Sequence, residues 1–284
     1  MKNILLPTDF SKNAWNAIDY ALNLFKDDEC LFYLLHSYSP PLVQPTTPGA
    51  TTATTTEILL DSARKASEDG LNDVLKKITQ TNKNVKHQYK ILSEYDFFVG
   101  AVKTIVEDYR IDLIVMGTKG SSGLKEVIIG SNTAGVIGNV KSPILAIPEN
   151  AVFGPIKEIA FATDYDYYCE KDEIKPLVDI AKKTGASIKL LHALDSNDKL
   201  TKDQEQIKEY LDKILDKVDH TFHTLTGISV ETATRVFIQS RDIGMLCMIA
   251  KKHNFFQRIF GKPRVEEISF HIQIPYLVIH ECGK

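Results

Sequence analysis

The sequence has no apolar run of about 18 residues, the length that a transmembrane helix needs, so no membrane span is expected. The formal net charge is only −3, which gives no general attraction to nucleic acid or to an anionic membrane. The first residues lack the apolar core and cleavage site of a signal peptide. We therefore expect a soluble, cytoplasmic protein that uses neither nucleic acid nor membrane as a partner.

Cysteine is also scarce, and several catalytic motifs are absent. The four cysteines are far apart without a CxxC pair, which favours buried, reduced thiols over disulfides or a metal site. There is no HExxH, no GxSxG and no kinase signature. The 43% apolar and 25% charged residues are typical of a globular protein and exclude a disordered or collagen-like chain.

Three short stretches occur twice in the 284 residues. They are an apolar run that ends in Thr-Asp, a Leu-Leu-His triplet, and an apolar run around a proline. The copies lie at 2–9 and 157–164, at 34–36 and 190–192, and at 142–147 and 274–279. The repeat predicts two domains, 1–150 and 151–284, with the second shortened between its second strand and its last.

Each half alternates strand and helix signals. In the first half we expect strands at 4–7, 30–36, 85–92, 111–116 and 144–147, and helices at 11–25, 57–79, 97–109 and 131–140. Continuous apolar strands separated by helices predict an α/β fold, with a parallel sheet covered on both faces. Ligands in such folds bind outside the carboxyl ends of the strands.

Three polar segments follow strands of the first half. They are 7–9, the pair His36-Ser37, and the glycine-rich stretch 116–133. Glycines let backbone N–H groups approach phosphate oxygens, and the helix expected after residue 130 adds unpaired N–H donors. The spacing is not that of a Walker loop. Glycine spacing alone leaves two interpretations open, a polyphosphate site and an ordinary glycine-rich turn.

The stretch Gly117-x2-Gly120-x9-Gly130-Ser131 resembles the signature of ATP-binding members of the universal stress protein family. The opening ILLPTDFS, the Leu-Leu-His triplet and the closing SPILAIP are similar to that family too. The resemblance covers the chain as two tandem copies. It implies two open five-stranded parallel-sheet domains of the adenine nucleotide alpha hydrolase-like type, related by a pseudo-two-fold, that bind ATP with Mg²⁺.

The resemblance also implies a set of nucleotide-binding residues. Asp9 would contact the nucleoside, the backbone of Ser37 would read the adenine edge, and the glycine-rich stretch would hold ribose and phosphates. An alternative for Asp9 is a helix cap, and an alternative for Lys119 is a solvated loop lysine. The full set is Pro7, Asp9, Ser37, Met116, Gly117, Lys119, Gly120, Gly130, Ser131, Asn132 and Thr133.

The second half departs from this pattern. Ala250 and His253 stand where the first two glycines should be, and an apolar segment follows at 255–260. We expect this domain not to bind ATP in the family's manner, and its apolar loop to pack on a neighbour rather than open a lipid-like pocket. Its third helix is expected to be cut short.

The remaining histidines are weaker candidates. His220 and His223 are expected on a helix end, where they could share a metal or form a solvated pair. His36 and His192 occupy equivalent places in the repeat, which favours a shared structural role over catalysis.

The predicted function is an ATP-binding stress-response regulator with a degenerate C-terminal domain and no catalytic residues. Two alternatives stay open: a slow ATPase or autophosphorylating enzyme, and a nucleotide-free interaction scaffold. A final edge strand must be paired or covered, and tethering keeps the partner strand close. We therefore expect the runs after Pro143 and Pro275 to pair antiparallel within the chain, and we leave a homodimer of whole chains open.

Overall fold

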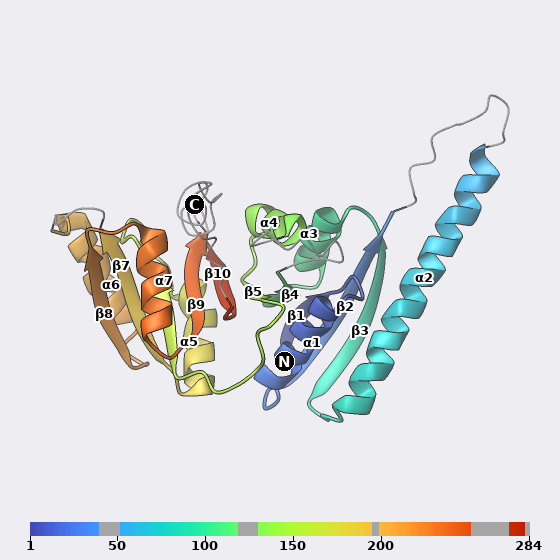
Figure 1. The fold of residues 1–284 in the computed structure, drawn as a ribbon. Helices are drawn as coiled ribbons and strands as arrows, with labels where there is room; N and C mark the ends of the chain where they lie inside the picture. Colours follow the sequence, from blue (N-terminus) through green and yellow to red (C-terminus); the bar gives the residue numbers. More distant parts are fainter. Residues whose placement is uncertain (40–51, 119–129, 195–198, 251–272, 282–284) are drawn as a thin grey trace.

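The computed structural model describes residues 1–39, 52–118, 130–194, 199–250 and 273–281 (Figure 1). The elements of the first half are β1 (Lys2–Pro7), α1 (Lys12–Leu24), β2 (Cys30–Tyr38), α2 (Thr52–Thr81), β3 (His87–Tyr95), α3 (Phe98–Asp108), β4 (Leu113–Gly117), α4 (Ser131–Asn139) and β5 (Ile144–Ile147). Those of the second half are β6 (Glu158–Ala162), α5 (Lys171–Thr184), β7 (Ser187–Leu194), α6 (Lys202–Ile214), β8 (His220–Thr226), α7 (Val230–Ser240), β9 (Ile243–Ala250) and β10 (Tyr276–His280).

All strands of the described chain join one ten-stranded sheet in the order β3-β2-β1-β4-β5-β10-β9-β6-β7-β8 (Figure 1). Neighbouring strands are parallel within each half, as predicted for an α/β fold. Read outwards from the centre, the two halves have equivalent orders, so a pseudo-two-fold relates them. In the first half the strand order reverses between β1 and β4, which is where such folds bind ligands.

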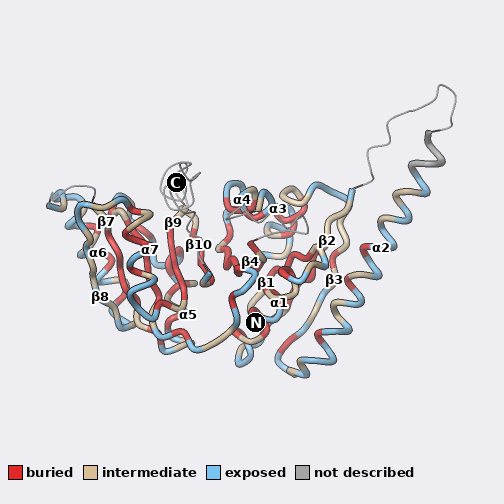
Figure 2. Tube along the Cα trace, in the orientation of Figure 1, coloured by how far each residue is buried: buried red, intermediate tan, exposed pale blue. Residues whose placement is uncertain are grey.

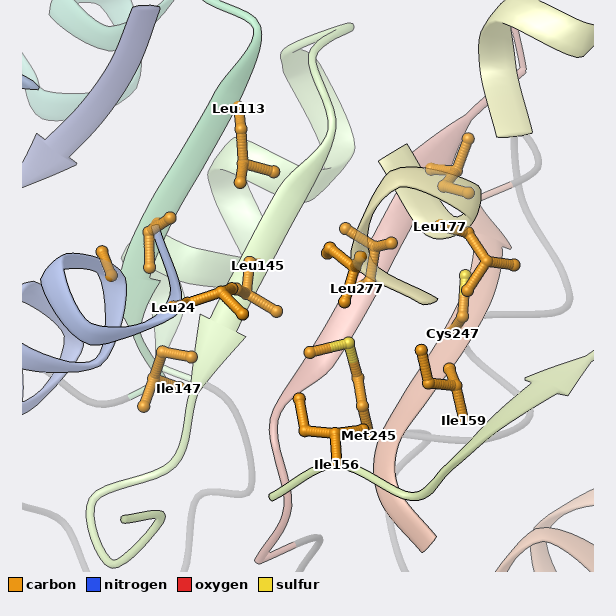
Figure 3. Packing of buried hydrophobic residues seen from close by; sticks show 14 of the residues in the cluster. Leu24, Leu113, Leu145, Ile147, Ile156, Ile159, Leu177, Met245, Cys247 and Leu277 are labelled. Atoms are coloured by element: carbon orange, nitrogen blue, oxygen red, sulfur yellow. The ribbon is translucent and has the colours of Figure 1, made fainter. Parts of the chain in front are cut away.

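The two halves meet where β5 and β10 pair antiparallel. Leu277 lies opposite Leu145, and both side chains are fully buried. Figure 3 shows them at the centre of an apolar cluster that extends from Leu24 in the first half to Ile156 and Met245 beyond the junction. The sheet and its core therefore run through both halves without a break.

Helices cover both faces of this sheet, and the buried residues follow the strands through the interior (Figure 2). One core cluster includes buried residues of α1, α2, α5 and α6. The other includes residues of α3, α4 and α7. Alternate residues of a strand point to opposite faces, so Ile4 and Leu6 belong to the first cluster and Leu5 to the second. This two-sided burial explains why the strands read as unbroken apolar runs.

The segment between the halves is tied to α1. Asn16 donates from Nδ2 to the carbonyl oxygens of Pro148 at 3.1 Å and Ala151 at 2.9 Å. The ring of Phe153 packs edge-on against Tyr20 at 5.3 Å between centroids. None of the helices in the described residues is both long and apolar enough to cross a membrane.

Two expectations about the second half are wrong. His220 and His223 lie in strand β8 and not on a helix end. This outer strand alternates between more and less exposed residues, so the sequence has no apolar run there that would predict a strand. The third helix is not cut short either, since α7 and α3 both have 11 residues. The second half is shorter mainly because α6 has 13 residues where α2 has 30.

Candidate functional site

A cleft of about 420 Å³ opens at the carboxyl ends of the first-half strands, at the switch point between β1 and β4. Nine of the predicted site residues line it: Pro7, Asp9, Ser37, Met116, Gly117, Gly130, Ser131, Asn132 and Thr133. Lys119 and Gly120 lie outside the described residues. The structure thus brings residues from four separate segments, far apart in sequence, to one place.

The Thr-Asp pair after β1 builds a tight turn. The Thr8 hydroxyl accepts from the N–H of Phe10 at 3.0 Å, and Asp9 Oδ1 accepts from the N–H of Ser11 at 3.1 Å. Phe10 sits at φ 63°, a left-handed conformation that these bonds hold in a non-glycine residue. The helix cap itself is Ser11, whose Oγ accepts from the N–H of Ala14 at 3.2 Å. Asp9 thus lies two residues before the cap, and its carboxylate lines the cleft.

The second half repeats this turn. Tyr165 has φ 55°, its N–H donates to Thr163 Oγ1 at 3.1 Å, and the N–H of Asp166 donates to Asp164 Oδ1 at 3.2 Å. In both copies the Thr-Asp pair therefore has a local structural role, which is to hold this turn. The presence of Asp164 alone is no sign of a second nucleotide site.

The two repeat-equivalent histidines stack on the residues with positive φ. His36 lies 4.4 Å from Phe10 between ring centroids, and His192 lies 4.7 Å from Tyr165. The two differ in their polar contacts, because His36 Nδ1 pairs with the Ser67 hydroxyl at 2.8 Å and His192 Nδ1 donates to a backbone carbonyl. Stacking is the shared structural feature, and His36 in addition lines the cleft.

Burial lowers the pKa of His36 below its ordinary value, and the nearby Asp9 carboxylate opposes this shift. The hydroxyl of Ser67 continues the chain of hydrogen bonds to Ser93 at 2.7 Å. The imidazole is thus fixed from behind by α2 and β3 and is mainly neutral at neutral pH. It offers the cleft an aromatic and polar wall without a fixed charge.

Gly117 ends β4 at a point of close approach. A Cβ atom there would lie 2.7 Å from Nδ2 of Asn13, a buried residue of α1. The carbonyl oxygen of Gly117 accepts from Thr133 Oγ1 at 2.9 Å, and the N–H of Gly130 donates to Thr118 O at 2.7 Å. These bonds fix the start of α4 against the end of β4.

Two helix N-termini that line the cleft have no side-chain cap. The N-cap residues are Gly130 for α4 and Phe97 for α3, and neither makes a side-chain cap bond. By contrast, Ser11, Thr201 and Ser229 cap α1, α6 and α7. Uncapped N-terminal N–H groups and the positive end of the helix dipole favour an anion. At α3 the carboxylate of Asp96 already accepts from the N–H of Phe97, so of these two helices it is α4 whose N-terminus is open to an anion in the cleft.

Among the described residues that line the cleft, the charged side chains are the carboxylates of Asp9 and Asp96. Asp96 Oδ1 accepts from the N–H of Phe97 at 2.6 Å. No group of three acidic, histidine or cysteine residues suited to a metal occurs in the described parts of the chain. A cation beside these two acids would therefore need further ligands from whatever else the cleft binds.

The sequence did not point to the wall formed by Asp96, Phe97 and Phe98. These residues follow β3 without a spaced motif. The one available signal is the strand register, because parallel pairing puts Tyr95 beside Tyr38 and carries the next residues to the same edge.

The equivalent place in the second half is nearly closed. There the described residues line a cavity of about 30 Å³, room for about one or two water molecules. Tyr165 is 1% exposed where Phe10 is 41% exposed. Gln204 of α6 also donates from Nε2 to the carbonyl of Asp164 at 3.1 Å. The shorter α6 thus closes over the turn. His253 and the apolar segment 255–260 lie outside the described residues.

The other candidates do not form a site in the described residues. His220 bonds Asp212 Oδ1 through Nε2 at 3.1 Å, while His223 Nε2 pairs with Thr221 at 2.9 Å. Three residues apart on a strand, the two imidazoles point to opposite faces. Cys30, Cys169 and Cys247 are buried, and Cys282 lies outside the described residues.

Comparison with known proteins follows the same outline. A model of the universal stress protein family matches residues 1–148. Universal stress protein MJ0577 of Methanocaldococcus jannaschii is 30% identical over 161 residues, which cover 51% of this chain and 94% of that protein. Universal stress protein MJ0531 of the same organism is 27% identical over 147 residues, covering 51% of this chain and 81% of that protein.

A solved structure extends the likeness to the whole chain. The crystal structure of a universal stress protein from Archaeoglobus fulgidus has a TM-score of 0.67 and covers 98% of both chains at 16% identity. At that identity the likeness shows the fold alone. It shows, however, that both halves together form an arrangement already seen in a crystal.

Proposed function

Because the chain belongs to the universal stress protein family, we propose that it is a cytoplasmic stress-response regulator that binds ATP in its first half. In this proposal residues 1–150 form the ATP-binding domain. Residues 151–284 form a second domain of the same fold, which has lost the site and serves a structural role.

The proposal rests on the difference in volume between the cleft of the first half and the cavity at the equivalent place in the second half. One is a cleft of about 420 Å³, within the usual size of a small-molecule site, and the other a cavity of about 30 Å³. The larger one is lined by the N-terminus of α4, which has no side-chain cap and suits phosphate oxygens. The loss of the glycines in the second half agrees with its closed cavity.

The residues present fit an adenine nucleotide. Asp9, Ser37 and Met116 all line the cleft, and in this proposal they would contact the nucleoside. The N–H groups of residues 131–133 and the Ser131 hydroxyl would hold phosphates close to Gly130, with Lys119 and Gly120 completing the cradle by motif. Mg²⁺ bound with the nucleotide would offset the charge of phosphates that lie near two carboxylates.

We favour binding over turnover. Both acids that line the cleft among the described residues accept a backbone N–H, Asp9 from Ser11 and Asp96 from Phe97. One oxygen of each carboxylate is therefore engaged with its own loop, and no sequence motif places either acid to activate an attacking group. Hydrolysis would then be slow beside binding and release.

The first prediction concerns stoichiometry. We expect one ATP per chain by isothermal titration calorimetry, because the second place holds only about one or two waters. The variant Gly130→Val puts a branched side chain at the N-cap of α4, where phosphate must approach the backbone, and should abolish the heat of binding. Two equivalent sites, or unchanged affinity in this variant, would contradict the proposal. Nucleotide released from denatured wild-type protein identifies the base.

A further inference from the structure

We propose that His280, the last residue of β10, positions helix α4 and is thereby a positioning residue for the nucleotide site in the other half. The inference rests on the proposed function for its effect on binding. The residue lies outside the cleft and comes from the half whose described residues leave only a small cavity at the equivalent place.

One hydrogen bond joins His280 to helix α4. His280 donates from Nε2 to the carbonyl oxygen of Ile137 at 2.8 Å. Ile137 belongs to the last turn of α4, where helix carbonyls find no partner within the helix. The imidazole thus holds the C-terminal end of the helix whose N-terminal end lines the cleft.

The shortness of α4 makes this bond consequential. The helix has nine residues, and a helix of that length depends on tertiary contacts for its stability. At its N-terminal end Thr133 bonds Gly117, and at its middle Gly135 lies against Val99 of α3, where a Cβ would come within 2.9 Å. His280 provides the corresponding contact at the C-terminal end. A change of tilt there would move the N–H groups that face the cleft.

The chemistry of His280 suits a fixed donor. A carbonyl oxygen only accepts, so Nε2 must carry the proton, and Nδ1 is buried without a hydrogen-bond partner among the described residues. Burial lowers the pKa of His280, although the carbonyl oxygens of Ile137 and Ser142 oppose the shift. The neutral ring donates the bond to Ile137 without needing a charge.

The first half has no side-chain donor at the position equivalent to His280. The sequence repeat relates Pro143 to Pro275, and the same offset relates Pro148 to His280. Proline has no side-chain donor, so the first half offers no equivalent bond to the second. His280 thus belongs to the half with the small cavity and contacts the helix that lines the large cleft.

The test compares His280→Leu with His280→Gln in the full chain. Leucine removes the donor, whereas the glutamine amide can replace Nε2. We expect His280→Leu to weaken ATP binding by about 2- to 12-fold, the range for one lost hydrogen bond of about 0.5–1.5 kcal/mol, and His280→Gln to restore most of it. Hydrogen–deuterium exchange of nucleotide-free protein should show faster exchange in 131–139 for the leucine variant alone. His223→Leu, on the outer strand of the same half, serves as the matched control and should change neither.

The outcomes separate the two proposals. If wild-type protein binds no ATP, the proposed function fails, and the exchange of α4 still decides the role of His280. If His280→Leu leaves both the exchange of 131–139 and the affinity unchanged, His280 does not position the helix. If glutamine fails to rescue and both variants unfold at lower urea concentration throughout the chain, the histidine acts only in overall stability, which also overturns the inference.

Discussion

Replacing Gly117 with alanine is expected to weaken ATP binding by about 10- to 100-fold, that is by about 1.4–2.7 kcal/mol. The added Cβ would lie 2.7 Å from Nδ2 of Asn13, closer than real Cβ contacts come. Because Asn13 is buried near the start of α1, its side chain cannot simply turn into solvent, and the end of β4 would have to move as well. The carbonyl of Gly117 also accepts from Thr133, so this shift would misplace the first turn of α4. Calorimetry on the full chain measures the change.

A second glycine provides the control. Gly138 lies in α4, and a Cβ there would meet nothing within 4 Å. Gly138→Ala should leave the affinity unchanged and raise the free energy of unfolding by about 0.5–1 kcal/mol through helix propensity. If Gly117→Ala and Gly138→Ala both bind ATP as tightly as the wild type does, the close approach at the end of β4 has no part in binding. A loss of the same size in both would point to α4 as a whole.

The elements that the sequence predicts best are the buried strands. The run at 111–116 reads as a strand, and β4 covers Leu113–Gly117. Because both faces of the sheet are covered by helices, such a strand has no polar side and stands out in the sequence. The outer strand β8 has no such apolar run, and the sequence pattern wrongly predicts a helix end for its histidines. The start of α2 at Thr52, before the predicted residue 57, follows a stretch that no apolar period marks.

The candidate site is predictable where it depends on spaced motifs. The positions of residues 7–9, 36–37 and 116–133 at strand ends follow from strand order, and the cleft contains the described members of all three. The wall at Asp96 and the bond from His280 depend on which strands and helices become neighbours in space. No local pattern encodes such contacts, so they need coordinates. The positive φ of Phe10 cannot be predicted from a local pattern either, because only the hydrogen bonds of its turn require it.

Replacing Leu277 with alanine is expected to lower the free energy of unfolding by about 2–5 kcal/mol, the usual cost of emptying a buried leucine site. Leu277 is fully buried and pairs with Leu145 across the β5–β10 junction (Figure 3). The cavity would therefore open in the apolar cluster that both halves share. Trp15, the single tryptophan, lies in α1 of the first half and packs against this cluster. Its fluorescence reports the first half, while the substitution is in the second.

The shared core predicts that both halves respond together. In urea, the transition seen by Trp15 fluorescence should move to lower concentration in Leu277→Ala, in step with the loss of helix seen by circular dichroism. Val152→Ala is the control, because Val152 is 84% exposed and its truncation should change stability by less than about 0.5 kcal/mol. A Trp15 transition that stays in place while the helix signal splits into two steps would mean that the halves unfold independently. In that case the antiparallel pair would join two separate cores, and a contact such as that of His280 could not pass a change from one half to the other.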